Sequence, residues 1–168
     1  LREREYFNEN YESDYVDRYV YNYLGLNCKP DGIEHKKFFV DKNVRRAIAY
    51  TVPVDQIIEV ILDGKAIRQA AQISRLKKTY NHTLDIIPLD IEMATKLLDE
   101  AGWIDTDGDN IRDKVVDGEK LQMSFNLSYM SSPITKEIVL MMKESMYKAG
   151  IDANPNPMDF TLFYKNAQ

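Results

Sequence analysis

Hydrophobic residues recur at helical spacing in several stretches of the chain, and each stretch carries signals for where a helix starts and ends. The first helix is expected to begin after Asp41, whose side chain suits the N-cap position, and to end before Pro53. The same signals place the later helices over residues 55–64, 90–102 and 133–150, and from Asp159 onward. Residues 65–89 have no clear period and are expected to form a long irregular connection.

Alternation of apolar and polar residues predicts the strands. The clearest alternation runs from Leu121 to Tyr129, and the turn signal Asp117-Gly118 precedes it, so a hairpin is expected over residues 111–130. Two further strands are expected over residues 19–26 and 151–156, the second confined by its prolines to an edge or a bulge. This order of elements predicts an α/β fold, a mixed β-sheet with packed helices.

Composition excludes several classes of function. The 168 residues fit a single domain, and 22 Lys and Arg against 27 Asp and Glu give a net charge of −5, which argues against nucleic-acid binding. Cys28 is the only cysteine, so an internal disulfide is excluded. The chain has two histidines and lacks a nucleophile motif, a metal triad or a glycine-rich phosphate loop, so we expect no enzyme.

The length of the apolar runs and the start of the chain bear on its place in the cell. No apolar run reaches the roughly 18 residues of a membrane span. The chain begins at Leu1 in a charged stretch without a signal peptide, which is expected of an excised fragment and leaves the compartment open.

An acidic loop follows the third expected helix and has the spacing of a calcium-binding loop. Its alternate positions supply four carboxylates and one backbone carbonyl: Asp105, Asp107, Asp109, Ile111 and Asp113. Asn110 stands where such loops have glycine, and Val116 stands where they have glutamate. Two interpretations therefore stay open, a Ca²⁺ site and a polar turn whose aspartates accept hydrogen bonds from backbone amides.

Four blocks of sequence, in a fixed order, resemble a known family. They are Tyr21–Asn27 (YNYLGLN), Val40–Tyr50 (VDKNVRRAIAY) with Leu62-Asp63-Gly64 after it, Ala94–Trp103 (ATKLLDEAGW) with Asp105–Asp109 after it, and Ala149-Gly150-Ile151 with Met158-Asp159-Phe160 after it. Together they resemble the family 5 extracellular solute-binding proteins, which serve ABC importers as peptide-, oligopeptide- or nickel-binding components. The family usually has prolines in the segment that here reads Ala70–Ser74.

The resemblance implies a fold and a mode of action. It implies one partial lobe, over residues 1–168, of a larger protein whose two lobes close over a solute and present it to an ABC permease in the membrane. It also implies a position in the periplasm or on the outer face of the cell membrane, often with a lipid anchor. The candidate solute contacts under this resemblance are Asn27, Gln72 and Ser74.

The alternative to the solute-binding hypothesis is a stand-alone calcium-binding structural or interaction module. Its loop would be the acidic segment described above, and its stability would depend on Ca²⁺. The solute-binding reading requires no cofactor, with Ca²⁺ at the acidic loop as an optional addition.

Overall fold

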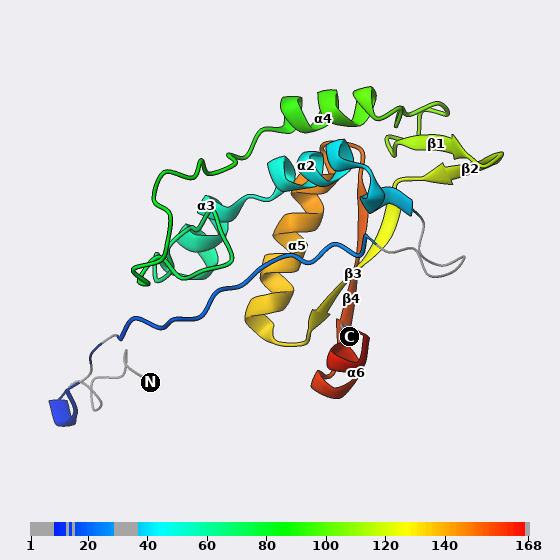
Figure 1. The fold of residues 1–168 in the computed structure, drawn as a ribbon. Helices are drawn as coiled ribbons and strands as arrows, with labels where there is room; N and C mark the ends of the chain where they lie inside the picture. The colour runs from blue at the N-terminus through cyan, green and yellow to red at the C-terminus, as the bar shows by residue number, and fades with distance from the viewer. Residues whose placement is uncertain (1–8, 13, 15, 29–36, 167–168) are drawn as a thin grey trace.

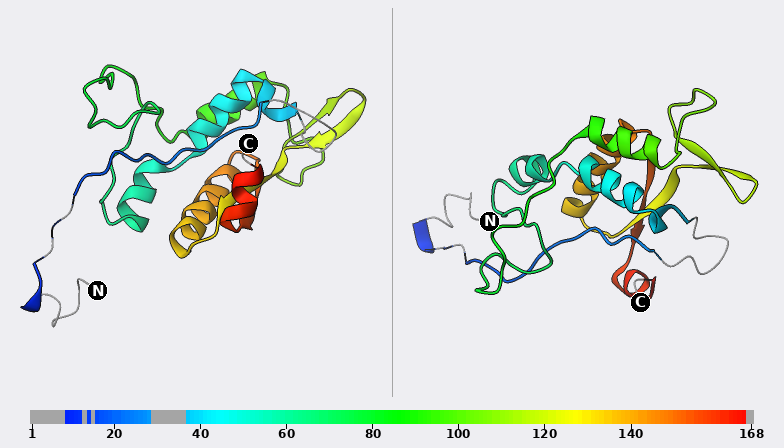
Figure 2. Two further views of the ribbon diagram at one scale, coloured as in Figure 1. Left: turned by 60° about the horizontal axis from the view of Figure 1, so that its bottom comes forward. Right: turned by 45° about the horizontal axis from the view of Figure 1, so that its top comes forward.

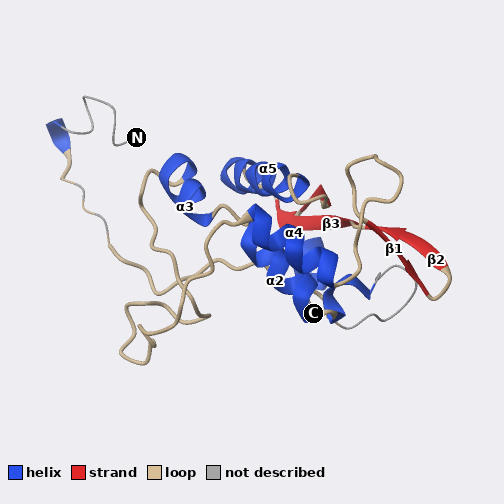
Figure 3. Cartoon of the chain, turned by 90° about the horizontal axis from the view of Figure 1, so that it is seen from above, coloured by secondary structure: helices blue, strands red, loops and turns tan. Residues whose placement is uncertain are grey.

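The computed structural model describes residues 9–12, 14, 16–28 and 37–166 (Figure 1). Helices α2 (Lys42–Thr51) and α4 (Ile91–Glu100) lie side by side, and α5 (Pro133–Tyr147) packs against the strands β3 (Ser124–Met130) and β4 (Asp152–Met158). A hairpin of β1 (Asp113–Val116) and β2 (Glu119–Gln122) projects from the end of this body (Figure 3). The α/β class is confirmed, although the strands form two separate pairs.

Capping side chains fix the helix starts where the sequence predicts them. Asp41 accepts a hydrogen bond from the Asn43 amide at 2.7 Å, and Asp90 accepts one from the Met93 amide at 2.8 Å. Asp159 likewise accepts the Leu162 amide at the start of α6 (Phe160–Asn166). The apolar stripe of α2 is buried as expected.

The second helix begins at a different residue from the one that the sequence predicts. It begins at Val54 rather than after Asp55, as α3 (Val54–Gln56), and continues as a π-helical turn, η2 (Ile57–Ile61). Pro53 occupies the N-cap position, because its ring restricts φ and leaves no amide to satisfy there. A short 3-10 helix, η1 (Lys37–Val40), precedes α2.

The expected hairpin over residues 111–130 is real but shorter. Its turn is Asp117-Gly118, both at positive φ, as a tight two-residue turn requires. The ladder ends at Gln122, because Met123 leaves β2 and turns into the core, where it is fully buried. Residues 124–130 then form β3, which pairs with β4 in parallel, and α5 is the crossover between them.

Two hydrogen bonds fix which way the backbone groups of β3 and β4 point. The Asp152 amide donates to the Met123 carbonyl at 2.9 Å, and the Ser131 amide donates to the Met158 carbonyl at 2.9 Å. The even-numbered residues of β4 therefore face β3, while Pro155 and Pro157 lie at positions facing away from it. Proline is tolerated there because no ladder bond is lost.

A single apolar cluster joins the helices to the strands. Phe38, Trp103 and Met123 are among its buried members, and the Phe38 and Trp103 rings lie 5.2 Å apart between centroids. Ile151 and Ala153 of the β4 segment are fully buried in the same cluster. One continuous core therefore holds α2, α4, α5 and the β3–β4 pair together.

The prediction of a paired strand over residues 19–26 is wrong. The segment runs extended across the body, but no described strand pairs with it (Figure 2). Leu24 and Leu26 pack against the core while Tyr23 is exposed, so the alternation is real although none of the described strands pairs with it. The apolar face expected on α6 is also largely exposed at Phe160 and Tyr164, and Ala167 lies outside the described residues.

The described helices are too short or too polar to cross a membrane.

Substitution of Gly150 probes how closely Arg112 packs against the end of α5. Gly150 has φ +79°, and a Cβ there would lie 2.7 Å from Cγ of Arg112, whereas Gly118 has φ +86° with open space around it. Gly118→Ala carries only backbone strain, about 1 kcal/mol, and Gly150→Ala adds displacement of Arg112, for a total of roughly 2–3 kcal/mol. Urea unfolding of both variants measures the difference, and equal losses would contradict the packing described here.

Candidate functional site

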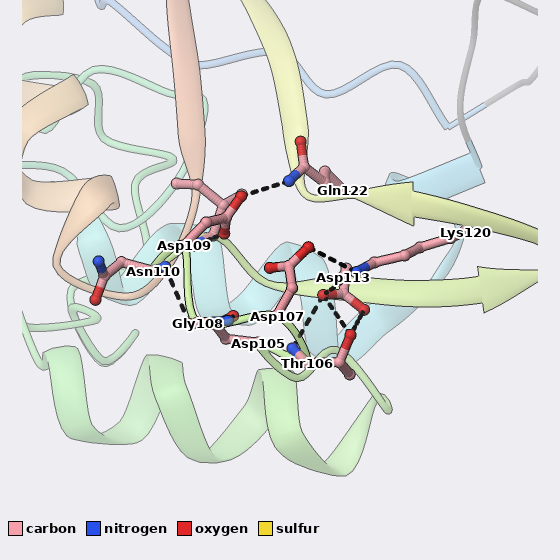
Figure 4. A network of polar contacts seen from close by, with 10 residues as sticks. Asp105, Thr106, Asp107, Gly108, Asp109, Asn110, Asp113, Lys120 and Gln122 are labelled. Atoms are coloured by element: carbon pink, nitrogen blue, oxygen red, sulfur yellow. Dashed lines mark hydrogen bonds and ion pairs between the residues drawn. The ribbon is translucent and has the colours of Figure 1, made fainter.

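The acidic loop between α4 and β1 is closed by its own aspartates (Figure 4). The carboxylate of Asp105 accepts the Gly108 amide at 2.7 Å and the Asn110 amide at 3.0 Å, and Asp109 accepts the Ile111 amide at 2.8 Å. Asn110 has φ +70°, which asparagine tolerates better than most residues. Backbone amides therefore satisfy much of the acceptor capacity of the loop.

The β2 strand supplies a cation to the loop. Lys120 Nζ lies 2.8 Å from Asp107 Oδ2 and 3.2 Å from Asp113 Oδ2. Asp113 is buried, and it also accepts the Thr106 amide at 3.0 Å and the Thr106 hydroxyl at 2.8 Å. Gln122 donates its side-chain amide to Asp109 at 2.6 Å, so the hairpin and the loop are joined at three aspartates.

These contacts shift the pKa values of the groups in the expected directions. The hydrogen bond from Lys120 lowers the pKa of Asp107 and raises that of Lys120 in return. Burial by itself raises the pKa of Asp113, but the hydrogen bonds from Thr106 and Lys120 outweigh it, so its pKa is lowered. All three groups are therefore charged at neutral pH.

The structure brings together part of the predicted calcium ligand set. Carboxylate oxygens of Asp105, Asp107 and Asp109 lie within 4.8 Å of one another. Asp113 instead contacts Thr106 and Lys120, while the Ile111 amide donates to Asp109 and its carbonyl, the predicted ligand, stays a prediction. The close approach suits a cation, while Lys120 already neutralises one side of the group.

The predicted solute contacts differ in accessibility. Asn27 and Gln72 are exposed, whereas Ser74 is buried and its hydroxyl accepts the Leu76 amide at 3.3 Å. Ser74 belongs to an ordered connection in which the Tyr80 hydroxyl accepts the Ala70 amide at 3.0 Å and Arg68 forms an ion pair with Asp55. Nothing in this geometry tests solute contact, so the three residues stay a prediction.

Sequence reasoning missed the edge formed by the carboxyl ends of β3 and β4. Because the strands are parallel, Ser131, Ser132 and Asp159 follow them at the same end of the pair. Ser132 caps α5 by accepting the Thr135 amide at 3.1 Å, and Ser131 is exposed beside it. A strand, a helix and a strand in succession over residues 121–158 are typical of a parallel pair joined by a crossover helix. Because residues 111–130 were assigned to one antiparallel hairpin, the sequence analysis did not predict this parallel pairing.

The ion pairs of Lys120 generate a stability prediction. Lys120→Met leaves the buried Asp113 carboxylate without its cation, so the thermal midpoint at pH 7 should fall by a few degrees. Because both aspartates have lowered pKa values, their stabilising effect is complete at neutral pH and is lost as the pH falls below about 4. The difference in thermal midpoint between wild type and Lys120→Met should therefore disappear in acid.

The matched control is Lys96→Met, which removes the same charge from an exposed position on α4. Thermal unfolding of both variants from pH 3 to pH 8 makes the comparison. An equal midpoint loss in the two variants at pH 7 would show that the contacts of Lys120 do not stabilise the fold.

Comparison with known proteins identifies relatives of the chain. The family model for bacterial extracellular solute-binding proteins, family 5, middle region, matches residues 2–168. The oligopeptide-binding protein AppA of Bacillus subtilis is 29% identical over 145 residues, 84% of this chain and 25% of AppA. A putative ABC transporter peptide-binding protein of Brucella ovis is 26% identical over 143 residues, 85% of this chain and 24% of that protein. The chain thus spans about a quarter of the length of these relatives.

Solved structures agree with the sequence relatives. AppA of Bacillus subtilis in complex with a nonapeptide matches with a TM-score of 0.70 and 28% identity, over 79% of this chain and 26% of that one. NikA from Brucella suis in complex with Fe(III)-EDTA matches with a TM-score of 0.66 and 27% identity, over 76% and 25%. The family expected from the four sequence blocks is confirmed: the chain belongs to the bacterial extracellular solute-binding proteins of family 5.

Proposed function

We propose that the chain is a partial lobe of the substrate-binding component of an ABC importer, which captures peptides or related small solutes when two lobes close. The observation that carries the proposal is the family match over residues 2–168, supported by the similarity to peptide-bound AppA. Capture of this kind needs hydrogen-bonding groups and a shaped surface, and it needs no group that makes or breaks bonds.

The solute is proposed to meet this lobe at the carboxyl ends of β3 and β4. Ligands of α/β folds bind beyond the carboxyl ends of parallel strands, where loops and helix starts present polar groups. Here that edge presents Ser131, Ser132 and Asp159, which are all exposed, as is Ile134 at the start of α5. Hydroxyls beside an apolar side chain suit the backbone and side chain of a neutral peptide segment.

Further solute contacts are proposed at the residues that the family resemblance suggested. Asn27 and Gln72 offer exposed amide groups, and Ser74 helps to hold the turn that presents Gln72. The partners under this proposal are the remaining lobe of the same protein and a membrane permease. The place of action is the periplasm or the outer face of the membrane, reached with a lipid anchor.

The proposal predicts peptide binding by the full-length protein. Calorimetry with peptide mixtures of two to ten residues should detect binding, and Ser131→Trp should weaken it at least tenfold by filling the carboxyl edge. Lys96→Trp is the control, because α4 lies on the far side of the core from that edge (Figure 1). If Ser131→Trp binds peptide as tightly as the control, the solute does not bind at the carboxyl edge. If no peptide binds, the proposed solute class is contradicted.

Calcium is proposed as an additional ligand of the acidic loop, because three carboxylates lie within 4.8 Å of one another. Ca²⁺ would have to compete with Lys120 for Asp107. We therefore expect weak binding at millimolar Ca²⁺, detected by fluorescence of the nearby Trp103, and tighter binding in Lys120→Met. If neither protein responds to millimolar Ca²⁺, the loop is a polar turn.

A further inference from the structure

Residues 69–86, in the connection between η2 and α4, loop out from the body of the protein (Figure 2). The structure describes this whole segment, and within it only Ser74 and Tyr80 are buried. No residue of the segment belongs to the apolar cluster that joins the helices to the strands. A segment that buries so little against the core can open while the core stays folded.

The segment is held together by contacts between its own residues. The Tyr80 hydroxyl accepts the Ala70 amide at 3.0 Å, and the Lys77 amide donates to the Ser74 carbonyl at 3.0 Å. The guanidinium carbon of Arg75 lies 6.0 Å from the centroid of the Tyr80 ring. Among the described residues, the backbone hydrogen bonds of the segment join only its own members. We therefore expect these contacts to form and break together.

One side chain ties both ends of the segment to the core. Arg68 forms an ion pair with Asp55 of α3 and donates a hydrogen bond to the Ile87 carbonyl at the far end. Ile57 continues the helix that contains Asp55 and is buried in the core. The Arg68 side chain is 13% exposed, so water competes weakly for its N–H groups. Arg68 therefore closes the segment into a loop and anchors that loop.

The closed loop leaves one acceptor unpaired. The side-chain carbonyl oxygen of Gln69, the residue next to Arg68, is buried and has no hydrogen-bond partner among the described residues. Opening of the loop lets water reach this oxygen, so the unpaired acceptor favours the open state. Arg68 and Gln69 thus act in opposite directions on one equilibrium.

We propose that residues 69–86 form a strap that opens as one unit while the core stays folded, that Arg68 holds the strap closed, and that a bound solute stabilises the closed state through Gln72. The link to the solute rests on the solute contact proposed above, because opening carries the exposed Gln72 away from its position. The opening itself does not depend on which solute the protein binds. A solute that binds only the closed strap lowers the open population.

Amide hydrogen exchange in the peptide-free full-length protein tests the strap. The amides of Ala70, Lys77 and Tyr80 should be protected to a similar degree and should exchange roughly 100-fold faster than the amides inside α2. Strap amides that exchange as slowly as those of α2 would show that the segment opens only with the core, and they would overturn the proposal.

Two substitutions should change this exchange in opposite directions. Arg68→Met should speed the exchange of the strap amides about tenfold, and Gln69→Met should slow it severalfold, because one removes the anchoring contacts and the other removes the unpaired acceptor. Exchange in α2 should stay the same in both variants. Lys65→Met is the control, since the exposed ion pair of Lys65 with Asp63 lies outside the strap. An equal effect of Arg68→Met on α2, or an equal effect of the control on the strap, would overturn the role of Arg68.

A bound peptide tests the link to the solute. The peptide that binds most tightly in the calorimetry, added at about 100 times its Kd, should slow the exchange of the strap amides about 100-fold. Unchanged exchange in the peptide-bound protein would overturn the link through Gln72. If no peptide binds, the proposed solute class and this link fail together, while exchange in the free protein still supports or overturns the strap.

Discussion

The fold depends on the way Arg112 holds the ends of two helices against the strands. Its guanidinium donates to the Ala149 carbonyl at 2.9 Å and to the Trp103 carbonyl at 2.5 Å, and it forms an ion pair with Asp99. Its backbone donates to Gly150 and accepts from Met123. One mostly buried cation thus satisfies carbonyls that lie just beyond the ends of α4 and α5, next to the starts of β3 and β4.

Arg112 also fixes the two ends of the acidic loop. The loop leaves α4 near Asp99 and returns to the core at Arg112, so both of its ends are fixed by the same side chain. Asp105 and Asp109 then close the backbone between them, and Lys120 ties it to the hairpin. Turn closure and the contact with Lys120 therefore account for the hydrogen bonds and ion pairs of the aspartates at alternate positions.

The sequence predicts those features of the fold that are decided locally. Asp41 and Asp90 cap helices because a short acceptor next to free amides is a local arrangement, and the buried stripe of α2 follows from helical spacing alone. Pairing is not local. Residues 124–130 alternate equally well in a hairpin or a parallel pair, and residues 19–26 alternate without any partner among the described strands. The candidate site shares this limit, since Ser131 and Asp159 meet only through the parallel register of β3 and β4.

The acidic loop and the carboxyl edge of β3 and β4 lie at opposite ends of the parallel strands. The acidic loop adjoins the start of β3, through Arg112 and Met123, and so lies at the amino ends of the parallel strands. The solute contact proposed above lies at the opposite end, at Ser131 and Asp159. Under that proposal, a cation at the acidic loop would act on the stability of the lobe. At the carboxyl edge Ser132 and Asp159 cap helices α5 and α6, while Arg112 and Trp103 close the core at the other end of the strands.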